Sequence, residues 1–525
     1  MPLLALAFLL AGCDSGEPPG PGAKTPETPE ALETVGKWRR HVVVLEAGQV
    51  DGNPFEVELT GHFVHEATGT TLSLHGYYDG AGTWKIGFMP TLVGRWTYST
   101  ESPASKLDGA QGSLDAVQAG LPGMLKGDSA FPRKWRYTEG PYVVPMAFRM
   151  EFFSEPASDD AFREAAEFLR ERVAGHLLET RLMEEYGRFA GRHDFIFEGP
   201  WEEHRFDLEV WRRMERRMEV LTEMGLGAHV MFYSDQGGRP PWPARSETEA
   251  LVIRYAVARL AGYPVLWFNT GIDVGEYRDS GDVTWMGDIL RSLDPYGHPV
   301  SSREATPLAY MESETFTSKG FPTAARVDAM ISAFQDATRP VSFDDAWGEN
   351  RASHPEKDHS PSDIRRAFWK AVVAGGVGGL VRGGDELAES YNGFFSIGLF
   401  ADELESEQWL RLIPAFMEDL GNTFGSMVPA PGIVSGVGVY ALADPGLSKI
   451  VIYSIGEGDR YNSGGSRIEL LLGGEEGAWQ ASWFDPRTGD EISEGQVLGG
   501  GARELTTPTP DDWVLVLTGA SGSDG

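Results

Sequence analysis

The chain has 525 residues, too many for a single hydrophobic core, and 41% of them are hydrophobic, which is typical of folded domains. The formal net charge at pH 7 is −33, because 78 acidic residues outnumber 45 basic ones. Such an acidic chain repels phosphate backbones, so a nucleic-acid partner is not expected. The single cysteine, Cys13, excludes an internal disulfide and a thiolate metal cluster.

The first 13 residues resemble a bacterial lipoprotein signal. An apolar run from Met1 to Leu10 is too short to span a bilayer, and Ala11-Gly12 places small residues directly before Cys13. The resemblance implies lipidation of Cys13 and a lipid-anchored protein of the bacterial cell envelope, periplasmic or on the cell surface. The alternative is a chance cysteine in a signal peptide. Residues 14–36 are rich in proline and are predicted to be a flexible linker.

Residues 37–118 have the pattern of a small β-sandwich. Short strand candidates alternate with glycine-rich turns such as Asp79-Gly80-Ala81-Gly82, and no helical pattern separates them. The runs Tyr78–Pro90 and Gly94–Tyr98 resemble the corresponding motifs of domain of unknown function 5060. In that family the module precedes a glycoside-hydrolase-like barrel. The resemblance therefore implies a barrel in the next segment.

Residues 125–428 alternate between strand and helix patterns, as βα units do. The fold expected is α/β, a (β/α)8 TIM barrel flanked by an N-terminal and a C-terminal β-sandwich. A capping box is predicted at Ser246–Glu249, and a cap with proline at the first helical position at Ser360-Pro361. The strands are expected at 142–148, 177–182, 228–233, 265–268, 298–302, 308–315, 339–343 and 377–381, and four of the helices at 159–172, 206–224, 282–293 and 407–420.

Residues 430–519 return to a β pattern, and residues 520–525 are predicted to be a tail. The run Trp483–Gly489 resembles a turn of a C-terminal β module that often follows such barrels and has been called collagen-binding. Nothing in the segment resembles a collagen-reading surface. We expect a structural β-sandwich.

Two predicted strands are followed by carboxylates. The strand at 265–268 leads into Asp273 and Glu276, and the strand at 339–343 leads into Asp344 and Asp345, with Glu349 beyond. Parallel strands of an α/β barrel present catalytic groups at their C-terminal ends, and glycoside hydrolysis needs two carboxyl groups beside the scissile bond. These five acids are the catalytic candidates.

The middle and seventh-strand region resembles apiosidase-like glycoside hydrolase barrels, through the run Pro340–Glu349. The resemblance implies an acid/base after the fourth strand and a nucleophile after the seventh. Asp345 stands where the family has a catalytic Glu. The Asn-Glu pair usual after the fourth strand is absent, since Asn269 is followed by Thr270.

Other residues near the predicted strand ends are candidates for substrate contact. Alternatives remain open for the acids: Asp273 caps the following turn, or Glu276 pairs with Arg278. The candidate substrate-binding residues are Asp235, Asn269, Arg278, Arg303, Tyr233 and Trp347.

The function expected is hydrolysis of a glycosidic bond in a polysaccharide or oligosaccharide, with no cofactor or metal. The alternatives are a catalytically degenerate, glycan-binding envelope lipoprotein and an envelope scaffold whose barrel is only structural. The partners expected are a carbohydrate and, through the anchor, a membrane.

Overall fold

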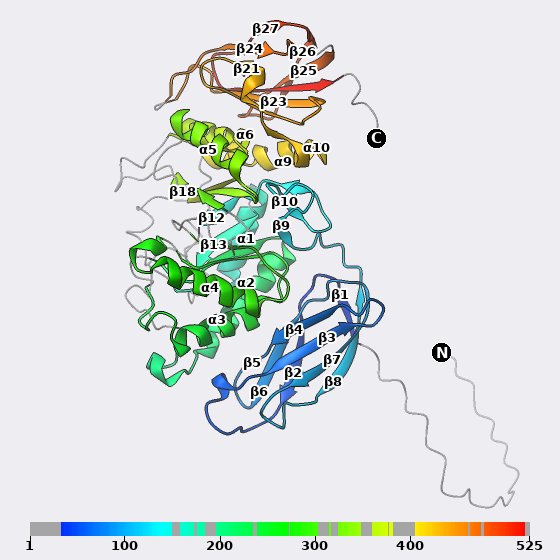
Figure 1. The fold of residues 1–525 in the computed structure, drawn as a ribbon, viewed down its shortest axis with the longest axis vertical. Coiled ribbons are helices and arrows are strands. Elements are labelled where there is room, and N and C mark those ends of the chain that lie inside the picture. The colour runs from blue at the N-terminus through cyan, green and yellow to red at the C-terminus, as the bar shows by residue number, and fades with distance from the viewer. Residues whose placement is uncertain are drawn as a thin grey trace, which may run out of the picture.

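The computed structural model describes residues 33–149, 158–172, 176–183, 196–234, 239–271, 273–302, 314–316, 324–347, 360–375, 377–381, 405–459, 462–473 and 477–519. The predicted signal with Cys13 lies outside these residues, as do Asp235, Arg303 and Glu349. Three parts follow one another along the long axis of the molecule: an N-terminal β module, a central α/β domain and a C-terminal β module (Figure 1).

The N-terminal module consists of two sheets that face each other. One has the strand order β1-β8-β7-β3-β4 and the other β2-β6-β5. Phe63 and Phe88 come from different sheets and stack with ring centroids 4.0 Å apart, so the core lies between the sheets. This is the sandwich-like arrangement predicted. The strands are β1 (Glu33–Gly36), β2 (His41–Glu46), β3 (Thr60–His65), β4 (Thr71–His75), β5 (Tyr77–Tyr78), β6 (Thr83–Phe88), β7 (Gly94–Glu101) and β8 (Gln111–Val117).

The central domain contains an eight-stranded parallel sheet with the order β16-β15-β14-β13-β12-β19-β18-β17. The first strand, β12, pairs with both the second and the last, β13 and β19. Among the described residues no pairing joins β16 to β17, which leaves these strands at the ends of the sheet. The strands are β12 (Ala147–Arg149), β13 (Leu177–Arg181), β14 (Gly227–Met231), β15 (Leu266–Asn269), β16 (Val300–Ser301), β17 (Glu314–Phe316), β18 (Val341–Trp347) and β19 (Val377–Val381).

The strand predicted at 142–148 is two strands in the structure. Residues Tyr142–Val143 form β11, which pairs with β10 (Trp135–Tyr137) in a small antiparallel sheet that also holds β9 (Leu125–Gly127). Only from Ala147 does the chain enter the parallel sheet. Pro145 lies between the two strands and has no N–H to donate to a ladder, which explains the break.

Of the two helix caps predicted, one forms in full and the other in part. Ser360 accepts the N–H of Asp363, with Pro361 at the first helical position of α6, as predicted. The predicted capping box at Ser246 is only half formed, because the Glu249 carboxylate accepts the N–H of Arg245 instead of that of Ser246. The helices here are α1 (Asp159–Arg172), α2 (Leu208–Glu223), α3 (Glu247–Leu260), α4 (Ser280–Leu293), α5 (Ala324–Asp336) and α6 (Pro361–Val373), with the short η1 (Pro54–Glu56) and η3 (Trp201–Glu203).

The closing helix predicted at 407–420 is interrupted. The structure has α8 (Glu405–Leu410) and α9 (Leu412–Asp419), followed by the short α10 (Thr423–Ser426). Pro414 cannot donate to the carbonyl of Leu410, four residues earlier, and its ring would clash with that carbonyl in a continuous helix. This proline accounts for the break at residue 411.

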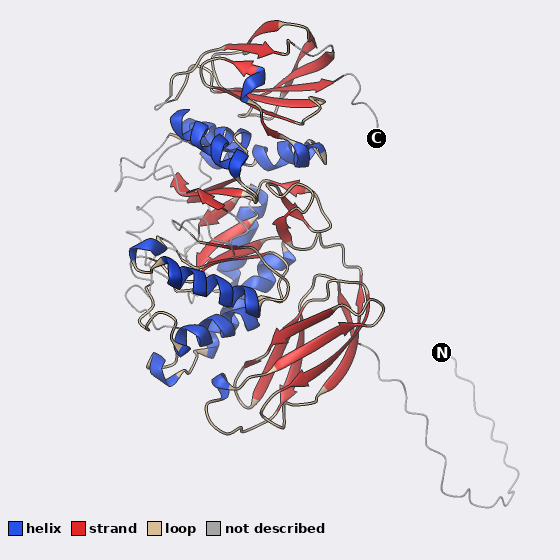
Figure 2. Cartoon of the chain, in the orientation of Figure 1, coloured by secondary structure: helices blue, strands red, loops and turns tan. Residues whose placement is uncertain are grey.

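The C-terminal module packs on the central domain through its larger sheet, which has the order β20-β22-β23-β28-β25-β26. One face of this sheet meets the smaller sheet, β21-β24-β27, across a separate apolar core. The other face meets a layer of helices, where Trp369 of α6 stacks on Tyr453 of β23 (Figure 2). The strands are β20 (Val428–Pro429), β21 (Val434–Ser435), β22 (Val439–Ala443), β23 (Lys449–Ser454), β24 (Arg467–Leu471), β25 (Ala478–Phe484), β26 (Glu491–Leu498), β27 (Ala502–Thr506) and β28 (Trp513–Gly519).

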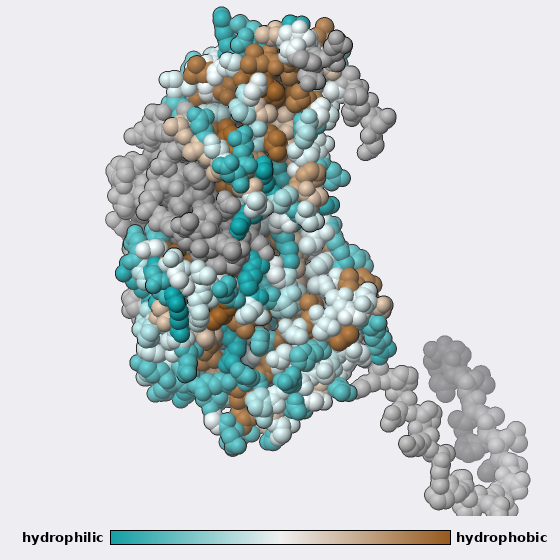
Figure 3. Space-filling view, in the orientation of Figure 1, coloured by the Kyte–Doolittle hydropathy of each residue, from teal (hydrophilic) through white to brown (hydrophobic). Residues whose placement is uncertain are grey.

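On the face shown in Figure 3 the described surface is mostly hydrophilic, with hydrophobic residues gathered over the C-terminal module at the top of the view. Exposed apolar side chains of this module include Val437, Leu471, Ile492 and Leu498. Among the helices of the described residues, none is both long enough and apolar enough to cross a bilayer.

Candidate functional site

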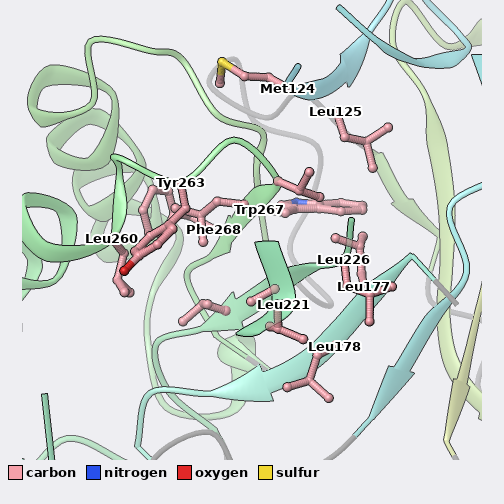
Figure 4. Close-up of a cluster of buried hydrophobic side chains, with 14 of the residues drawn as sticks. Met124, Leu125, Leu177, Leu178, Leu221, Leu226, Leu260, Tyr263, Trp267 and Phe268 are labelled. Atoms are coloured by element: carbon pink, nitrogen blue, oxygen red, sulfur yellow. The ribbon is translucent and has the colours of Figure 1, made fainter. Parts of the chain in front are cut away.

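The parallel sheet has one edge where all its strands begin and an opposite edge where they end, and these two edges are covered differently. The small sheet β9–β11 packs over the edge where the strands begin. There the ring centroids of Trp135 and Trp267, the second residue of β15, lie 4.8 Å apart. The Lys126 ammonium also donates to the carbonyl of Tyr296. Met124 and Leu125 belong to the same buried cluster as Trp267 (Figure 4). A substrate site on this sheet therefore belongs at the opposite edge, where the strands end.

Asn269 ends β15 and is fully buried. Its amide nitrogen donates to the Ser301 hydroxyl at 3.1 Å, and its side-chain oxygen accepts the N–H of Gly271 at 2.9 Å. These bonds hold β15 to β16 and fix the start of the turn that carries the candidate acids. Asn269 was predicted to contact substrate; in the structure its polar atoms are used within the protein.

Asp273 follows in a left-handed conformation, with φ 47° and ψ 37°, which is uncommon for a residue other than glycine. It precedes η4, a single turn over Val274–Glu276, but its side chain makes no capping hydrogen bond there. Asp273 thus occupies the N-cap position, where its carbonyl accepts the N–H of Glu276 at 2.9 Å, but its side chain does not cap the turn. Left-handed residues other than glycine cluster at functional sites, because surrounding structure must hold them in place.

Glu276 and Arg278 do not form the ion pair considered as an alternative. The Glu276 carboxylate is 49% exposed and lies 4.0 Å from the guanidinium of Arg239. Arg278 instead donates to Glu249 at 2.8 Å. Glu276 is therefore the more accessible of the two acids on this turn, with a cation beside it.

Glu249 holds the Asp273 turn in place through its bond to Arg278. Its carboxylate is only 1% exposed and accepts from the Arg245 N–H at 2.6 Å as well as from Arg278. Burial raises the pKa of Glu249, and the Arg278 charge and the Arg245 hydrogen bond oppose that rise. The Glu249–Arg278 pair thus links the start of α3 to the end of the acidic turn.

Tyr233 lies beneath the same pair. It is fully buried, and the Arg278 guanidinium lies 5.9 Å from its ring centre. Burial, with the Glu249 carboxylate nearby, raises the pKa of the Tyr233 hydroxyl. Tyr233 was predicted to contact substrate; in the structure its side chain is buried, with the Arg278 guanidinium near its ring.

Asp344 and Asp345 lie within β18, whereas the predicted strand ended at residue 343. On β18 the register passes from Phe343, opposite Gly378 of β19, to Trp347, opposite Leu380, so four steps on one strand face two on the other. The two aspartates thus occupy a bulge. Bulges re-aim side chains and are frequent next to active sites.

The remaining predicted residues are placed only in part. Trp347 ends β18, and only its backbone is described, as for Asp344 and Asp345. The roles of Asp235, Arg303 and Glu349 stay predictions, since these residues lie outside the described ranges. Within those ranges, no three His, Cys, Asp or Glu side chains are grouped to hold a metal ion.

Sequence reasoning missed two charged residues of this edge, Glu249 and Arg239. Glu249 has a local explanation as a capping residue, which concealed its pairing with Arg278, 29 positions away. Arg239 precedes a helix and has no pattern around it. No local signal identifies either residue.

Comparison with known proteins places two domains in the chain. Residues 34–103 match the domain of unknown function 5060, and residues 460–518 match the putative collagen-binding domain of a collagenase. No curated protein sequence matches the chain.

Three solved structures share the fold. A putative glycoside hydrolase from Bacteroides vulgatus ATCC 8482 has a TM-score of 0.71 at 17% identity, with 93% of this chain and 100% of that chain covered. A protein described as a glycoside hydrolase has a TM-score of 0.59 at 12% identity, covering 76% of this chain and 98% of that one. A family 5 glycoside hydrolase, also from Bacteroides vulgatus ATCC 8482, has a TM-score of 0.59 at 12% identity, covering 77% and 94%. The chain therefore has a fold that occurs in glycoside hydrolases.

Proposed function

We propose that the protein is a glycoside hydrolase that cleaves a glycosidic bond of a polysaccharide or oligosaccharide with a pair of carboxylates. One observation carries the proposal: two acid-bearing segments leave the same edge of a parallel sheet, and both have irregular backbone. These are the left-handed turn at Asp273 and the bulge at Asp344 and Asp345. The shared fold with glycoside hydrolases supports it.

The sheet is proposed to close as a (β/α)8 barrel between β16 and β17. Its strand order follows the chain, and β12 already pairs with β19, as the first and last strands of such a barrel do. In a closed barrel β15 and β18 are the fourth and seventh strands. Their ends then lie across the mouth from each other, where a sugar chain can lie between two acids.

The chemistry needs two roles. One carboxylic acid protonates the leaving oxygen, and a carboxylate on the other side attacks the anomeric carbon or activates water. Asp273 or Glu276 supplies one member, and Asp345, with Asp344 and Glu349 as alternatives, supplies the other.

Cys13 is proposed to carry a lipid that anchors the protein to the bacterial cell envelope. The sequence Leu10-Ala11-Gly12-Cys13 supports this proposal, together with the proline-rich segment that follows. Metabolic labelling with a palmitate analogue should tag the protein, and Cys13→Ala should abolish the label. An unlabelled wild-type protein would contradict the anchor without affecting the proposed activity.

The activity is tested by screening purified protein on plant and bacterial polysaccharides for new reducing ends. On the substrate that is cleaved, Asp345→Asn should lower kcat by about 10²- to 10⁴-fold, the usual contribution of such a group. Asp273→Asn and Glu276→Gln identify the partner, since only the true partner should give a loss of similar size. Asp160→Asn, an exposed aspartate of α1, is the matched control. Unchanged kcat in Asp345→Asn would rule out its catalytic role.

The rival function is glycan binding without hydrolysis. It is favoured by the residue after Asn269, where related barrels carry a glutamate: this chain has Thr270, which is fully buried and bonded to Ser302. No carboxylate occupies that position. Polysaccharide binding with no product, unaltered in affinity by Asp345→Asn, would support the rival.

A further inference from the structure

The N-terminal module and the central domain enclose a cavity of about 650 Å³ along their seam. Its walls come from η1 and the β5–β6 turn of the module, and from the chain between β13 and α2 of the central domain. We call this cavity the seam groove. It is lined by Asn53, Pro54, Phe55, Tyr78, Glu198 and Phe206, among others.

Tyr78 lies at the centre of this region. It lines the seam groove and also a neighbouring cavity of about 510 Å³, together with Pro54 and Ala81. The Tyr78 ring is only partly buried and meets Phe55 edge-on, with centroids 5.0 Å apart. Tyrosine has an apolar ring with a polar tip, so it suits a ligand that is apolar on its faces and polar at its edges.

The groove is held open by bonds across the seam. The Asn53 amide donates to the carbonyl of Glu203 at 3.1 Å, and the His204 ring contacts both Glu56 and Thr248. Deeper in the seam, the fully buried Arg259 donates to Asp79 of the module at 2.7 Å. Because these bonds hold the two walls in place, binding would cost little further ordering of the walls.

The charges of the groove favour a neutral ligand. Glu198 and Glu203 line it, and Arg205 is the cation among its described lining residues, where it pairs with Glu198 at 2.8 Å. The adjacent cavity adds Glu56, Glu58 and Glu247, with Arg254. The region therefore carries net negative charge, as does the whole chain, so phosphate or uronate groups would be repelled.

The central-domain wall of the groove lies just before and at the start of α2, the helix that precedes β14 of the parallel sheet. Pockets of 300–1,000 Å³ at domain interfaces, apolar with a few polar groups, are typical of small-molecule sites.

From this geometry we propose that the seam groove is an accessory binding site for a neutral polysaccharide, with a sugar ring on Tyr78. The ligand class rests on the proposed glycoside hydrolase function, whereas the site itself does not require catalysis. A polysaccharide held at the seam would stay attached to the protein that cuts it.

Affinity electrophoresis of the full chain tests this, in native gels containing mixed-linkage β-glucan, galactomannan, dextran or polygalacturonate. The protein carries Asp345→Asn so that the polymer is not cut during the run. At least one neutral polymer should retard it, and Tyr78→Ala should weaken that retardation at least 5-fold. The double variant E198A/R205A should weaken it too, and because both side chains are exposed it guards against a folding defect. Arg95→Ala, an exposed cation on another face of the module, is the control.

Two results would overturn the proposal: no neutral polymer retards the protein, whether or not polygalacturonate does, or retardation persists in both variants. Hydrolysis is measured separately on the protein with Asp345 intact. Retardation without product keeps the seam groove and removes the proposed catalysis. Product without retardation keeps the proposed catalysis and removes the seam groove as a binding site.

Discussion

Lys134 lies at the covered edge of the sheet with 5% of its surface exposed. Its ammonium is 4.2 Å from the ring centre of Phe424 and 5.3 Å from that of Phe334. Burial, with Arg133 adding repulsion, lowers the pKa of Lys134 to about 7. The negative faces of the rings oppose that shift and are worth up to about 2 kcal/mol for a desolvated cation.

The pH dependence of stability follows from this depressed pKa. An unfolded lysine titrates near pH 10.4, so between pH 7 and 10 the unfolded chain binds more protons and Lys134 makes stability rise with pH. Below pH 7 both states are charged, and the folded state bears the full cost of the buried cation. Lys134→Met should therefore be more stable than wild type at pH 6, by about 2 kcal/mol after allowing for the lost ring contacts.

Thermal unfolding of both proteins between pH 6 and pH 9 checks this prediction. The advantage of Lys134→Met should shrink as the pH rises. Lys106→Met, an exposed lysine of the N-terminal module, should show no such trend. A difference between Lys134→Met and wild type that stays constant with pH would contradict the depressed pKa.

The candidate site shows what residue types alone reveal. Asp273, Glu276, Asp344 and Asp345 were identified from acids that follow apolar runs, and the structure places all four at one edge of the sheet. The Glu249–Arg278 pair was not predicted. Its members are 29 positions apart in the chain, and only folding brings α3 into contact with the end of the Asp273 turn.

At the scale of elements, Gly227 shows how tightly β14 and β15 approach. A Cβ added there would lie 2.0 Å from the carbonyl oxygen of Val265 and 2.5 Å from its Cβ. That same carbonyl accepts the N–H of Ala228, so it cannot retreat without breaking the ladder between the strands.

Gly227→Ala should therefore destabilise the protein by about 2 kcal/mol or more, as overpacking in a well-packed core does. It should also lower activity, because β15 carries the Asp273 turn. Gly432→Ala, where nothing lies within 4 Å of the added carbon, should change stability by less than about 0.5 kcal/mol. Urea unfolding of both variants provides the comparison. Equal midpoints would show that β14 and β15 can separate at little cost.

An element boundary can be predicted from the sequence when the residues that cause it lie close to it in the chain. The helix predicted at 159–172 has those bounds in the structure, and α6 begins at its predicted cap. The break between α8 and α9 has a local cause, Pro414, but the helical spacing of apolar residues over 407–420 predicted one continuous helix. The bulge in β18 had none, because it is defined by the register against β19.

At the scale of the whole molecule, the C-terminal module is bound to the central domain by buried charges as well as apolar contacts. Asp512 accepts two hydrogen bonds from Arg365, at 2.5 and 3.0 Å, and Lys370 pairs with Asp459 at 2.7 Å. All four side chains are nearly or fully buried. The larger sheet thus packs against the helices on one face and against the smaller sheet on the other, whereas its outer strand β26 stays largely exposed.

A chain that ends after Met427 should therefore fail to fold as a soluble monomer. Removing the module would expose the apolar Trp369 face of α6 and take away Asp512 and Asp459, the carboxylates that pair with Arg365 and Lys370. A large exposed apolar face promotes association and aggregation. Sedimentation of the expressed protein measures the soluble fraction. A chain lacking residues 1–32 should stay soluble and serves as the control. A soluble, cooperatively unfolding truncated monomer would show that the central domain is independent.

The sequence by itself determined the three-part organisation, the strand and helix alternation, the cap of α6 and the identity of the acids at the strand ends. These features depend on residues close together in the chain, whose periodicity and hydrogen-bonding groups act locally. Only the tertiary structure decided the left-handed geometry of Asp273, the register bulge at Asp344 and Asp345, the partner of Arg278 and the groove at Tyr78. Each of these arises where segments distant in sequence meet, and their packing, charge pairing and burial exist only once the chain has folded.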